Sequence, residues 1–321
     1  MNIVFMTPHT RLSGGVKVIF RLANGLQRKG HKVTVIARKM ASWPDWLLDK
    51  ISFNLKKKSF VTDTDLPPKT HCVINFSDGT PFLPISKPQI LFLQGFGVHQ
   101  YEKECVNLMY SYAGIIATSS WLAKIANGAS GAKVHVVPPG VDDHFEPKQI
   151  KKSDIVGAIY HNLPTKNTDF IIKVFENLPS NYEKLLISVE PIKDDKILNI
   201  PGIRMVINPP QTLLPFIYSS LKVFISASIR EGFGLPPLEA MKCGCPVVMC
   251  KNSGLNDFVK HGNNCMIANL KVDEFVNMCI QVMADTDDLY TSLVNGGKRL
   301  AGKFSWSRSI DSFERALKEI L

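Results

Sequence analysis

The sequence has no long hydrophobic run. Its longest apolar stretches, Leu221–Ala227 and Pro246–Cys250, fall far short of the ~20 residues that a membrane-crossing helix needs. The first ten residues, MNIVFMTPHT, contain neither a basic segment nor a long apolar segment of the kind found in signal peptides. We therefore expect a cytoplasmic protein without a membrane-spanning segment.

Cysteine patterning is also missing. Seven cysteines make an odd number without framework spacing, and six of them, all but Cys105, lie in or beside apolar runs, which is typical of buried reduced thiols. Cys243 and Cys245, with Cys250 nearby, lack the second pair of ligands that structural zinc sites show. No disulfide, no metal site and no bound cofactor is expected.

Acidic residues are scarce in the first half. Of the net charge of +10, residues 1–148 contribute +8, from 18 Lys and Arg against 10 Asp and Glu, and residues 1–44 contain no acid at all. Such an excess favours a phosphate-rich partner or an anionic membrane surface, and it is equally consistent with a basic surface that binds nothing. Aromatic residues are not interleaved with the basic ones, so we expect no nucleic-acid partner.

Part of this charge forms a stripe on one predicted helix. Between positions 16 and 29, four polar residues fall within a narrow arc at ~100° per residue, opposite an apolar face. They are Lys17, Arg21, Asn24 and Arg28. A stripe of this kind is more often a solvated face than a binding surface.

The chain has no internal repeat, and strand-like runs alternate with helical segments, as in parallel sheets with crossover helices. The predicted strands are Ile3–Met6, Val33–Ala37, Cys72–Phe76, Ile90–Gln94, Gly114–Thr118, Val134–Val137, Ile155–Tyr160, Lys184–Val189, Arg204–Asn208, Val223–Ala227 and Pro246–Cys250. Helices are predicted over 169–177, over 213–219, from 236 onward and over 305–321.

A turn-rich, charged stretch from Pro138 to Lys152 interrupts this alternation. At ~150 residues per domain, the sequence predicts two doubly wound α/β Rossmann-like domains, 1–148 and 149–304, facing across a cleft. The last helix has an apolar face to bury, and packing against the first domain is one way to do so.

A glycine turn follows the first predicted strand at Gly14 and Gly15. Glycines between a strand and a helix let backbone N–H groups approach an anion. The sequence argues against a dinucleotide-dependent oxidoreductase, because the Gly-x-Gly-x-x-Gly pattern is missing and the second strand ends in Arg38 and Lys39 instead of an acid.

The most informative segment is 228–241, where a strand ends, a glycine turn follows and Pro236 occupies an early helical position. The turn and the helix start present backbone N–H groups to a diphosphate. Glu231 can accept hydrogen bonds from sugar hydroxyls, and Glu239 from the two hydroxyls of a ribose. Alternatively, Glu239 is a first-turn carboxylate stabilised by the helix dipole and Glu231 is a surface acid.

Taken together, this segment resembles the Glu-x7-Glu motif of the retaining GT-B glycosyltransferases of family 4, the group 1 transferases. The resemblance covers nearly the whole chain. It includes Gly14-Gly15-Val16, Gly30-His31, Pro139-Gly140-Val141-Asp142, Lys166, the block from Glu231 to Glu239, Cys243 to Val248, Gly262-x-Asn264 and Phe304-Ser305-Trp306.

The resemblance implies a role for each matching residue. Glu231 and Lys166 would be catalytic, with Glu231 near the anomeric carbon of the donor sugar and Lys166 stabilising the leaving diphosphate. The donor-binding residues that it implies are Gly15, Gln94, His161, Gly232, Phe233, Gly234, Leu235 and Glu239. Glu239 would hold the ribose.

Two positions depart from the family pattern. Tyr160 and His161 stand where an arginine is usual, so one phosphate charge is lost or replaced by histidine, and Gln94 stands where many members carry histidine. The implied activity is a metal-independent retaining transfer of a sugar from a nucleotide sugar to an acceptor hydroxyl, in glycan, cell-envelope or glycolipid synthesis. The alternative is a non-catalytic GT-B partner subunit that binds a nucleotide sugar or a polyanion. An acidic acceptor or peripheral attachment to the inner face of a membrane would account for the basic first half.

Overall fold

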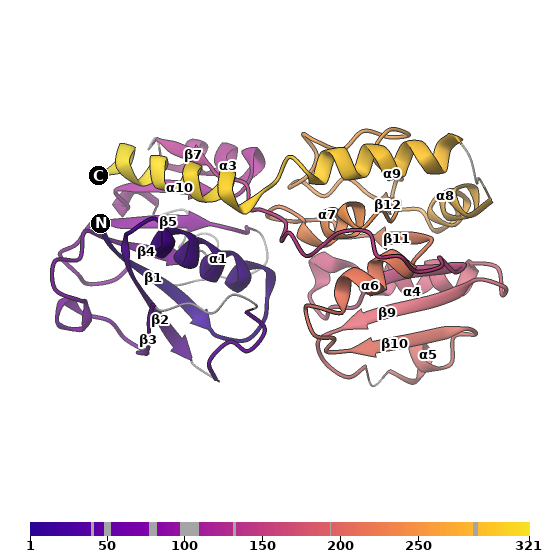
Figure 1. Cartoon of the computed structure of the whole chain (residues 1–321), viewed down its shortest axis with the longest axis horizontal. Helices are drawn as coiled ribbons and strands as arrows, with labels where there is room; N and C mark the ends of the chain where they lie inside the picture. Colours follow the sequence, from indigo (N-terminus) through magenta and orange to yellow (C-terminus); the bar gives the residue numbers. More distant parts are fainter. Residues whose placement is uncertain are drawn as a thin grey trace. The chain divides into compact units, whose positions relative to one another are not determined.

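The computed structural model describes residues 1–39, 42–47, 53–76, 82–96, 109–130, 133–192, 194–284 and 288–321. The chain divides into two compact units, one of Met1–Gly140 with Ser305–Leu321 and the other of Val141–Phe304. Each unit is built on a parallel β-sheet with helices, drawn in Figure 1. Among the described residues, no helix is both long and apolar enough to span a bilayer.

The first unit contains a seven-stranded sheet in the order β3-β2-β1-β4-β5-β6-β7. Its strands are β1 Asn2–His9, β2 Lys32–Lys39, β3 Asn54–Lys57, β4 Cys72–Phe76, β5 Gln89–Leu93, β6 Gly114–Ala117 and β7 Val134–Val136; its helices include α1 Gly14–Arg28, α3 Ser120–Ser130 and α10 Trp306–Ile320. Every strand pair is parallel, as predicted from buried apolar runs joined by helical segments. The edge strand β3 was not predicted, because its sequence NLKK carries no apolar run.

The second unit contains a six-stranded sheet in the order β10-β9-β8-β11-β12-β13. Its strands are β8 Ile155–Ile159, β9 Glu183–Ser188, β10 Ile203–Ile207, β11 Val223–Ser226, β12 Val247–Met249 and β13 Met266–Ile267; its helices are α4 Thr168–Asn177, α5 Asp195–Leu198, α6 Leu214–Ser220, α7 Leu235–Lys242, α8 Val272–Ala284 and α9 Asp288–Ala301. These pairs are parallel as well. Both units are therefore doubly wound and Rossmann-like, as the sequence predicts.

The C-terminal helix α10 packs against the first unit beside α1 (Figure 1). The ring of Phe313 is fully buried and lies 5.8 Å from Phe5 and 5.3 Å from Phe92 between ring centroids. At Gly114 a Cβ atom would come within 2.7 Å of the Ile320 side chain, so this glycine permits the close approach of the helix. The apolar face of the last helix thus closes the core of the first unit.

The boundary between the units lies at Gly140, eight residues before the position expected from the linker composition. The Val141 N–H donates to the Phe304 carbonyl, and the Lys148 N–H donates to Ser219 Oγ. Phe145 is fully buried beside Tyr218 of the second unit. Residues 141–148 therefore pack with the second unit, although their composition is that of a linker.

The polar stripe on α1 is not the solvated face that was expected. Lys17 and Asn24 are buried, with exposed fractions of 7% and 4%, whereas Arg28 is exposed. Helical periodicity gives the direction of a side chain on its own helix and does not show what packs over it. That interpretation is therefore wrong for two of the four residues.

Candidate functional site

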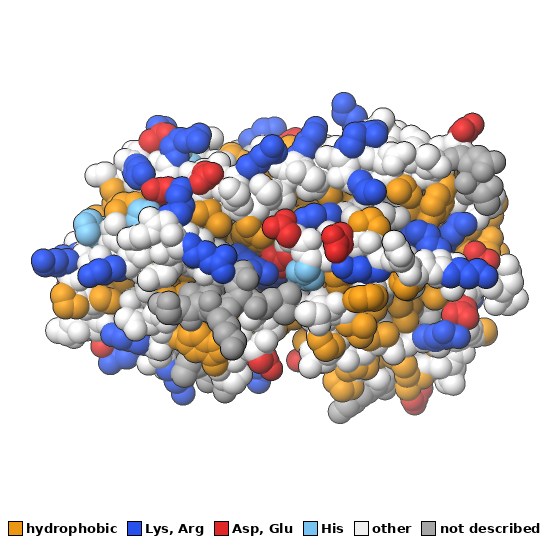
Figure 2. Space-filling view, viewed as in Figure 1, with side chains coloured by type: hydrophobic (Ala, Val, Ile, Leu, Met, Phe, Trp, Pro, Cys, Tyr) orange, Lys and Arg blue, Asp and Glu red, His pale blue; other side chains and the backbone are white. Residues whose placement is uncertain are grey.

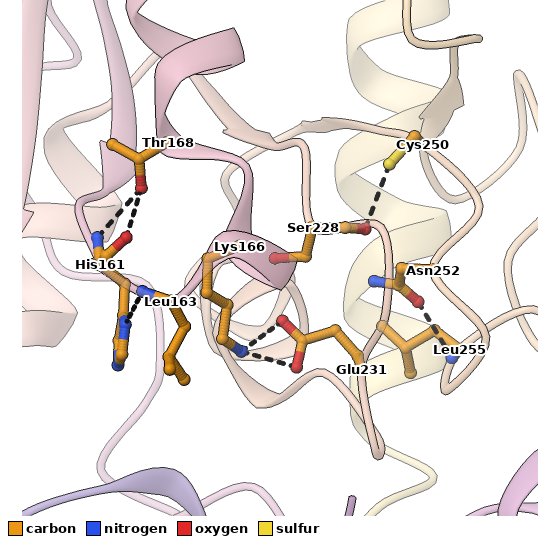
Figure 3. A network of polar contacts seen from close by, with 9 residues as sticks. All are labelled: His161, Leu163, Lys166, Thr168, Ser228, Glu231, Cys250, Asn252 and Leu255. Carbon is orange, nitrogen blue, oxygen red and sulfur yellow. Dashed lines mark hydrogen bonds and ion pairs between the residues drawn. The ribbon is translucent and has the colours of Figure 1, made fainter. Parts of the chain in front are cut away.

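The two residues expected to be catalytic meet at one end of the second sheet. Lys166 ends the short 3₁₀ turn Pro164–Lys166 after β8, and Glu231 lies in the turn after β11. Because β8 and β11 are parallel neighbours, their carboxyl ends lie side by side. The Lys166 Nζ donates to Glu231 Oε1 at 2.6 Å and to Oε2 at 2.7 Å (Figure 3).

Backbone hydrogen bonds hold both ends of this ion pair. The Glu231 N–H donates to the Asn252 carbonyl at 2.8 Å, and the Ile229 N–H donates to the Thr165 carbonyl at 2.9 Å. The second bond ties the turn that carries Glu231 to the loop that carries Lys166. The side chains keep exposed fractions of 28% for Lys166 and 13% for Glu231, so the pair is enclosed on most sides but remains accessible.

His161 stands next to this pair in the loop after β8. Its backbone N–H donates to Thr168 Oγ1 at 3.2 Å, and that hydroxyl donates back to the His161 carbonyl at 2.7 Å. Its ring Nδ1 accepts the Leu163 N–H at 3.0 Å, so in the neutral ring the proton lies on Nε2.

The charge state of His161 follows from its surroundings. Desolvation of the ring, followed by the nearby charge of Lys166, lowers the His161 pKa below its usual value of 6.5, even though the residue as a whole is exposed. At neutral pH the ring is an uncharged N–H donor.

The two side chains of the turn at 232–235, those of Phe233 and Leu235, are buried. The Phe233 ring is buried, with centroids 5.1 Å from the Phe304 ring and 6.5 Å from the Phe258 ring. Gly234 is the N-cap of α7 and adopts φ of +109°, a left-handed conformation that favours glycine. Leu235 begins the helix and is also buried.

Glu239 lies one turn inside α7 and not in its first turn, which contains no acidic residue. The alternative interpretation of Glu239 as a first-turn carboxylate is therefore wrong, and the residue is buried at 6% exposure. Burial raises the pKa of the neighbouring Tyr218 hydroxyl, and the Glu239 charge raises it further. The Glu239 carboxylate is thus buried on α7, the helix that follows the turn containing Glu231.

The two candidate residues of the first unit also meet. Gln94 follows β5, and its Nε2 donates to the Gly15 carbonyl at 3.2 Å near the start of α1. A Cβ atom on Gly15 would lie 2.7 Å from the Phe76 ring, so only glycine fits this turn without displacement. The predicted glycine turn and the amide that replaces the usual histidine therefore form one cluster.

Asn252 was missed by the sequence analysis. It lies in the loop after β12, its carbonyl holds Glu231, and its side chain is buried beside the Gly234 turn. An asparagine just beyond the carboxyl end of a fully buried strand was a signal that could have identified it.

One cysteine borders this site: Cys250 Sγ donates to the Ser228 carbonyl at 3.2 Å (Figure 3). Cys72, Cys243, Cys245, Cys250, Cys265 and Cys279 are buried free thiols, as predicted, and Cys105 lies outside the described residues. Burial raises the pKa of Cys243 and Cys245 to about 12 and that of Cys250 to about 11, so these sulfurs are protonated at neutral pH. In the described ranges, three or more His, Cys, Asp or Glu side chains never gather in a metal-binding arrangement.

Residues 141–300 match the family glycosyl transferases group 1. Sucrose-phosphate synthase from Thermosynechococcus elongatus superposes with a TM-score of 0.81 at 15% identity, covering 99% of this chain and 98% of that one. Anabaena HepE, solved in complex with UDP-glucose, superposes with a TM-score of 0.81 at 16% identity, covering 99% of this chain and 100% of that one. The fold is that of the GT-B glycosyltransferases.

Curated sequences named as mannosyltransferases match shorter segments. The MMP alpha-(1->4)-mannosyltransferase of Mycolicibacterium hassiacum is 25% identical over 207 residues, which are 60% of this chain and 50% of that protein. The O-antigen chain mannosyltransferase B of Escherichia coli is 33% identical over 97 residues, covering 30% and 25%. The chain therefore spans half or less of the length of these relatives.

Proposed function

We propose that this chain is a retaining, family 4 glycosyltransferase that moves a sugar from a nucleotide sugar to an acceptor hydroxyl. The observation that carries the proposal is the ion pair of Lys166 with Glu231 at the carboxyl ends of β8 and β11. A cation and a carboxylate next to a helix N-terminus are the groups needed to bind a diphosphate and a sugar together. The match of residues 141–300 to group 1 transferases supports it.

In the proposed reaction, the bond between the anomeric carbon and the phosphate oxygen breaks, and the diphosphate leaves with the electron pair. The acceptor oxygen attacks on the same face of the sugar, and its proton passes to the leaving diphosphate. The Lys166 ammonium stabilises the negative charge that develops on that group, while Glu231 orients the sugar. The cation in this proposal is a lysine and not a metal ion.

The chemistry of the donor and the acceptor is drawn from similar proteins. UDP-glucose in the HepE complex supports a nucleotide sugar, and the names of the mannosyltransferase relatives support a hexose. The O-antigen relative supports a role in glycan or cell-envelope synthesis. The basic first half supports an acidic acceptor, or one on an anionic membrane surface facing the cytoplasm.

A non-catalytic partner subunit that binds a nucleotide sugar or a polyanion is the competing proposal, because Tyr160 and His161 stand where an arginine is usual and because the first half is basic. Thermal unfolding with UDP, GDP, ADP and dTDP separates nucleotide binding from its absence, since a ligand of the folded state alone raises the melting temperature. Release of free nucleoside diphosphate from the corresponding nucleotide sugars then separates an enzyme from a binding subunit. No melting shift with any of the four would contradict the enzyme and the nucleotide-binding subunit, and would favour a subunit that binds a polyanion.

A further inference from the structure

The side-chain nitrogen of Asn252 is a buried hydrogen-bond donor that finds no acceptor in the part of the chain that is described. The residue is 1% exposed, so the amide is out of contact with bulk solvent. Leaving a buried amide N–H without an acceptor is costly, and native proteins rarely do so. The orphaned donor therefore calls for an explanation.

The orientation of this amide is fixed by its neighbours. Its Oδ1 accepts the Leu255 N–H at 3.4 Å, and its backbone N–H donates to Asn256 Oδ1 at 3.0 Å. Exchanging the oxygen and the nitrogen would place an NH₂ group against the Leu255 N–H, donor against donor. Figure 3 shows the nitrogen turned away from Leu255, on the side of the amide where Glu231 and Lys166 are drawn.

The nitrogen lies at the start of α7. It is 3.7 Å from the position that a Cβ atom on Gly234, the N-cap residue, would occupy. Pro236 and Pro237 lack N–H groups, so only Leu235 and Leu238 provide backbone donors among the first four helical residues. The helix dipole still favours an anion here, but half of the usual backbone donors are missing.

We propose that Asn252 supplies a missing donor: its Nδ2 binds a phosphate oxygen of the nucleotide-sugar diphosphate at the N-terminus of α7. This inference rests on the proposed function and adds a binding residue to the same site. The diphosphate satisfies the orphaned N–H, and the absence of acid in the first turn leaves the helix N-terminus open to its charge. Gly232 and Gly234 let the adjacent turn shift as the anion enters.

Ligand affinity, and not the melting temperature, is the readout that identifies this role. Asn252→Ala removes the orphaned Nδ2 donor, but it also removes Oδ1, the acceptor of the Leu255 N–H, so its effects on the melting temperature oppose each other. A purely structural asparagine would leave ligand affinity unchanged when it is replaced.

The test uses the full chain with three substitutions. Asn252→Ala removes the donor, and Asn252→Asp keeps the shape and the acceptor for Leu255 but places a negative charge where the nitrogen was. Asn256→Ala is the matched control, because it removes the acceptor of the Asn252 backbone N–H and leaves Nδ2 in place. The ligands are UDP, GDP, ADP, dTDP and inorganic pyrophosphate, titrated calorimetrically.

For every ligand that the parent binds, Asn252→Ala should raise Kd about tenfold and Asn252→Asp should raise it more, through charge repulsion. Asn256→Ala should lower the melting temperature with little change in Kd. If the parent binds a nucleotide and both Asn252 variants bind it equally well, this inference is wrong and the proposed function stands. If the parent binds none of the five ligands, both this inference and the proposed function are wrong.

Discussion

Lys166 and Glu231, 65 positions apart in the sequence, form an ion pair in which one ammonium group donates to both carboxylate oxygens, at 2.6 and 2.7 Å. The Glu231 carboxylate thus binds the Lys166 ammonium group, which the proposed function assigns to the diphosphate. A nucleotide sugar that binds Lys166 must compete with Glu231 for this group, and the released Glu231 carboxylate then becomes available to the sugar hydroxyls. One contact links the two halves of the proposed donor site.

Replacing Glu231 should therefore have opposite effects on transfer and on product binding. Glu231→Gln should reduce kcat by about 10²-fold or more, because a charged group that contacts the reacting sugar is lost. The same change should tighten binding of a free nucleoside diphosphate, since Lys166 no longer has an anionic competitor. Turnover and calorimetric Kd are measured together, with Glu176→Gln on the exposed side of α4 as the control. A Kd that rises would show that Glu231 does not restrain Lys166.

Glu239→Ala should weaken binding of the nucleoside diphosphate by about 1–3 kcal/mol, the cost of leaving ribose hydroxyls without a charged acceptor. Because the residue is buried beside Tyr218, the substitution should also lower the melting temperature. The corresponding 2′,3′-dideoxy nucleotide provides the control, since it has no ribose hydroxyls to lose. If Glu239→Ala weakens binding of both nucleotides equally, the carboxylate holds the fold and not the ribose.

Glu314 on α10 should make the first unit sensitive to acid. It forms ion pairs with Lys29 and Lys318, and its hydrogen bonds to these two lysines lower its pKa to about 2 from the usual 4.5. Since the folded-state pKa is depressed, the stabilisation is fully present above pH ~4.5 and is lost as the pH falls toward ~2.

Glu314→Gln should accordingly lower the melting temperature at pH 7 by roughly 2 °C or more, and the difference from the parent should vanish as the pH approaches ~2. Glu319→Gln is the control on the same helix, where a more exposed carboxylate pairs with Lys133 and should have a smaller effect. Equal melting temperatures of Glu314→Gln and the parent at pH 7 would show that apolar contacts alone stabilise the packing of α10 against the first unit.

The charge of the first half points to exposed lysines at the carboxyl ends of two strands. Lys17 of the α1 stripe is buried and cannot contact an acceptor or a membrane. Lys39 at the end of β2 and Lys56 and Lys57 of β3 are exposed and can do so. Figure 2 shows basic side chains on the face in view. Replacing all three with Gln should weaken binding to anionic vesicles or raise KM for an acidic acceptor, and the loss should shrink as salt is added.

Donor binding gives the specificity control for this triple variant, because Lys166 and the α7 turn belong to the other unit. Its Kd for nucleoside diphosphate should equal that of the parent. Unchanged vesicle binding and unchanged KM at low salt would mean that these lysines form only a solvated basic surface.

Much of this protein could be predicted from its sequence. Apolar runs identified eleven of the thirteen described strands, because parallel strands are buried on both faces and leave a continuous hydrophobic signal. The order of the glycine turn, Lys166 and the block from Glu231 to Glu239 predicted the GT-B fold, since each of these motifs is local in the chain. The edge strands β3 and β13 escaped notice, because β3 is largely exposed and β13 contains only two residues.

Only the tertiary structure decided the contacts that give these residues their chemistry. The sequence placed Lys166 and Glu231 after two strands, but the pairing of β8 with β11 brought them together. Charge and burial also depend on distant neighbours: the neutral ring of His161 and the orphaned amide of Asn252 arise from what packs around them. Local patterns determine where elements form, because they act over a few residues; the free energy of a charge or a buried donor depends on atoms that only folding places nearby.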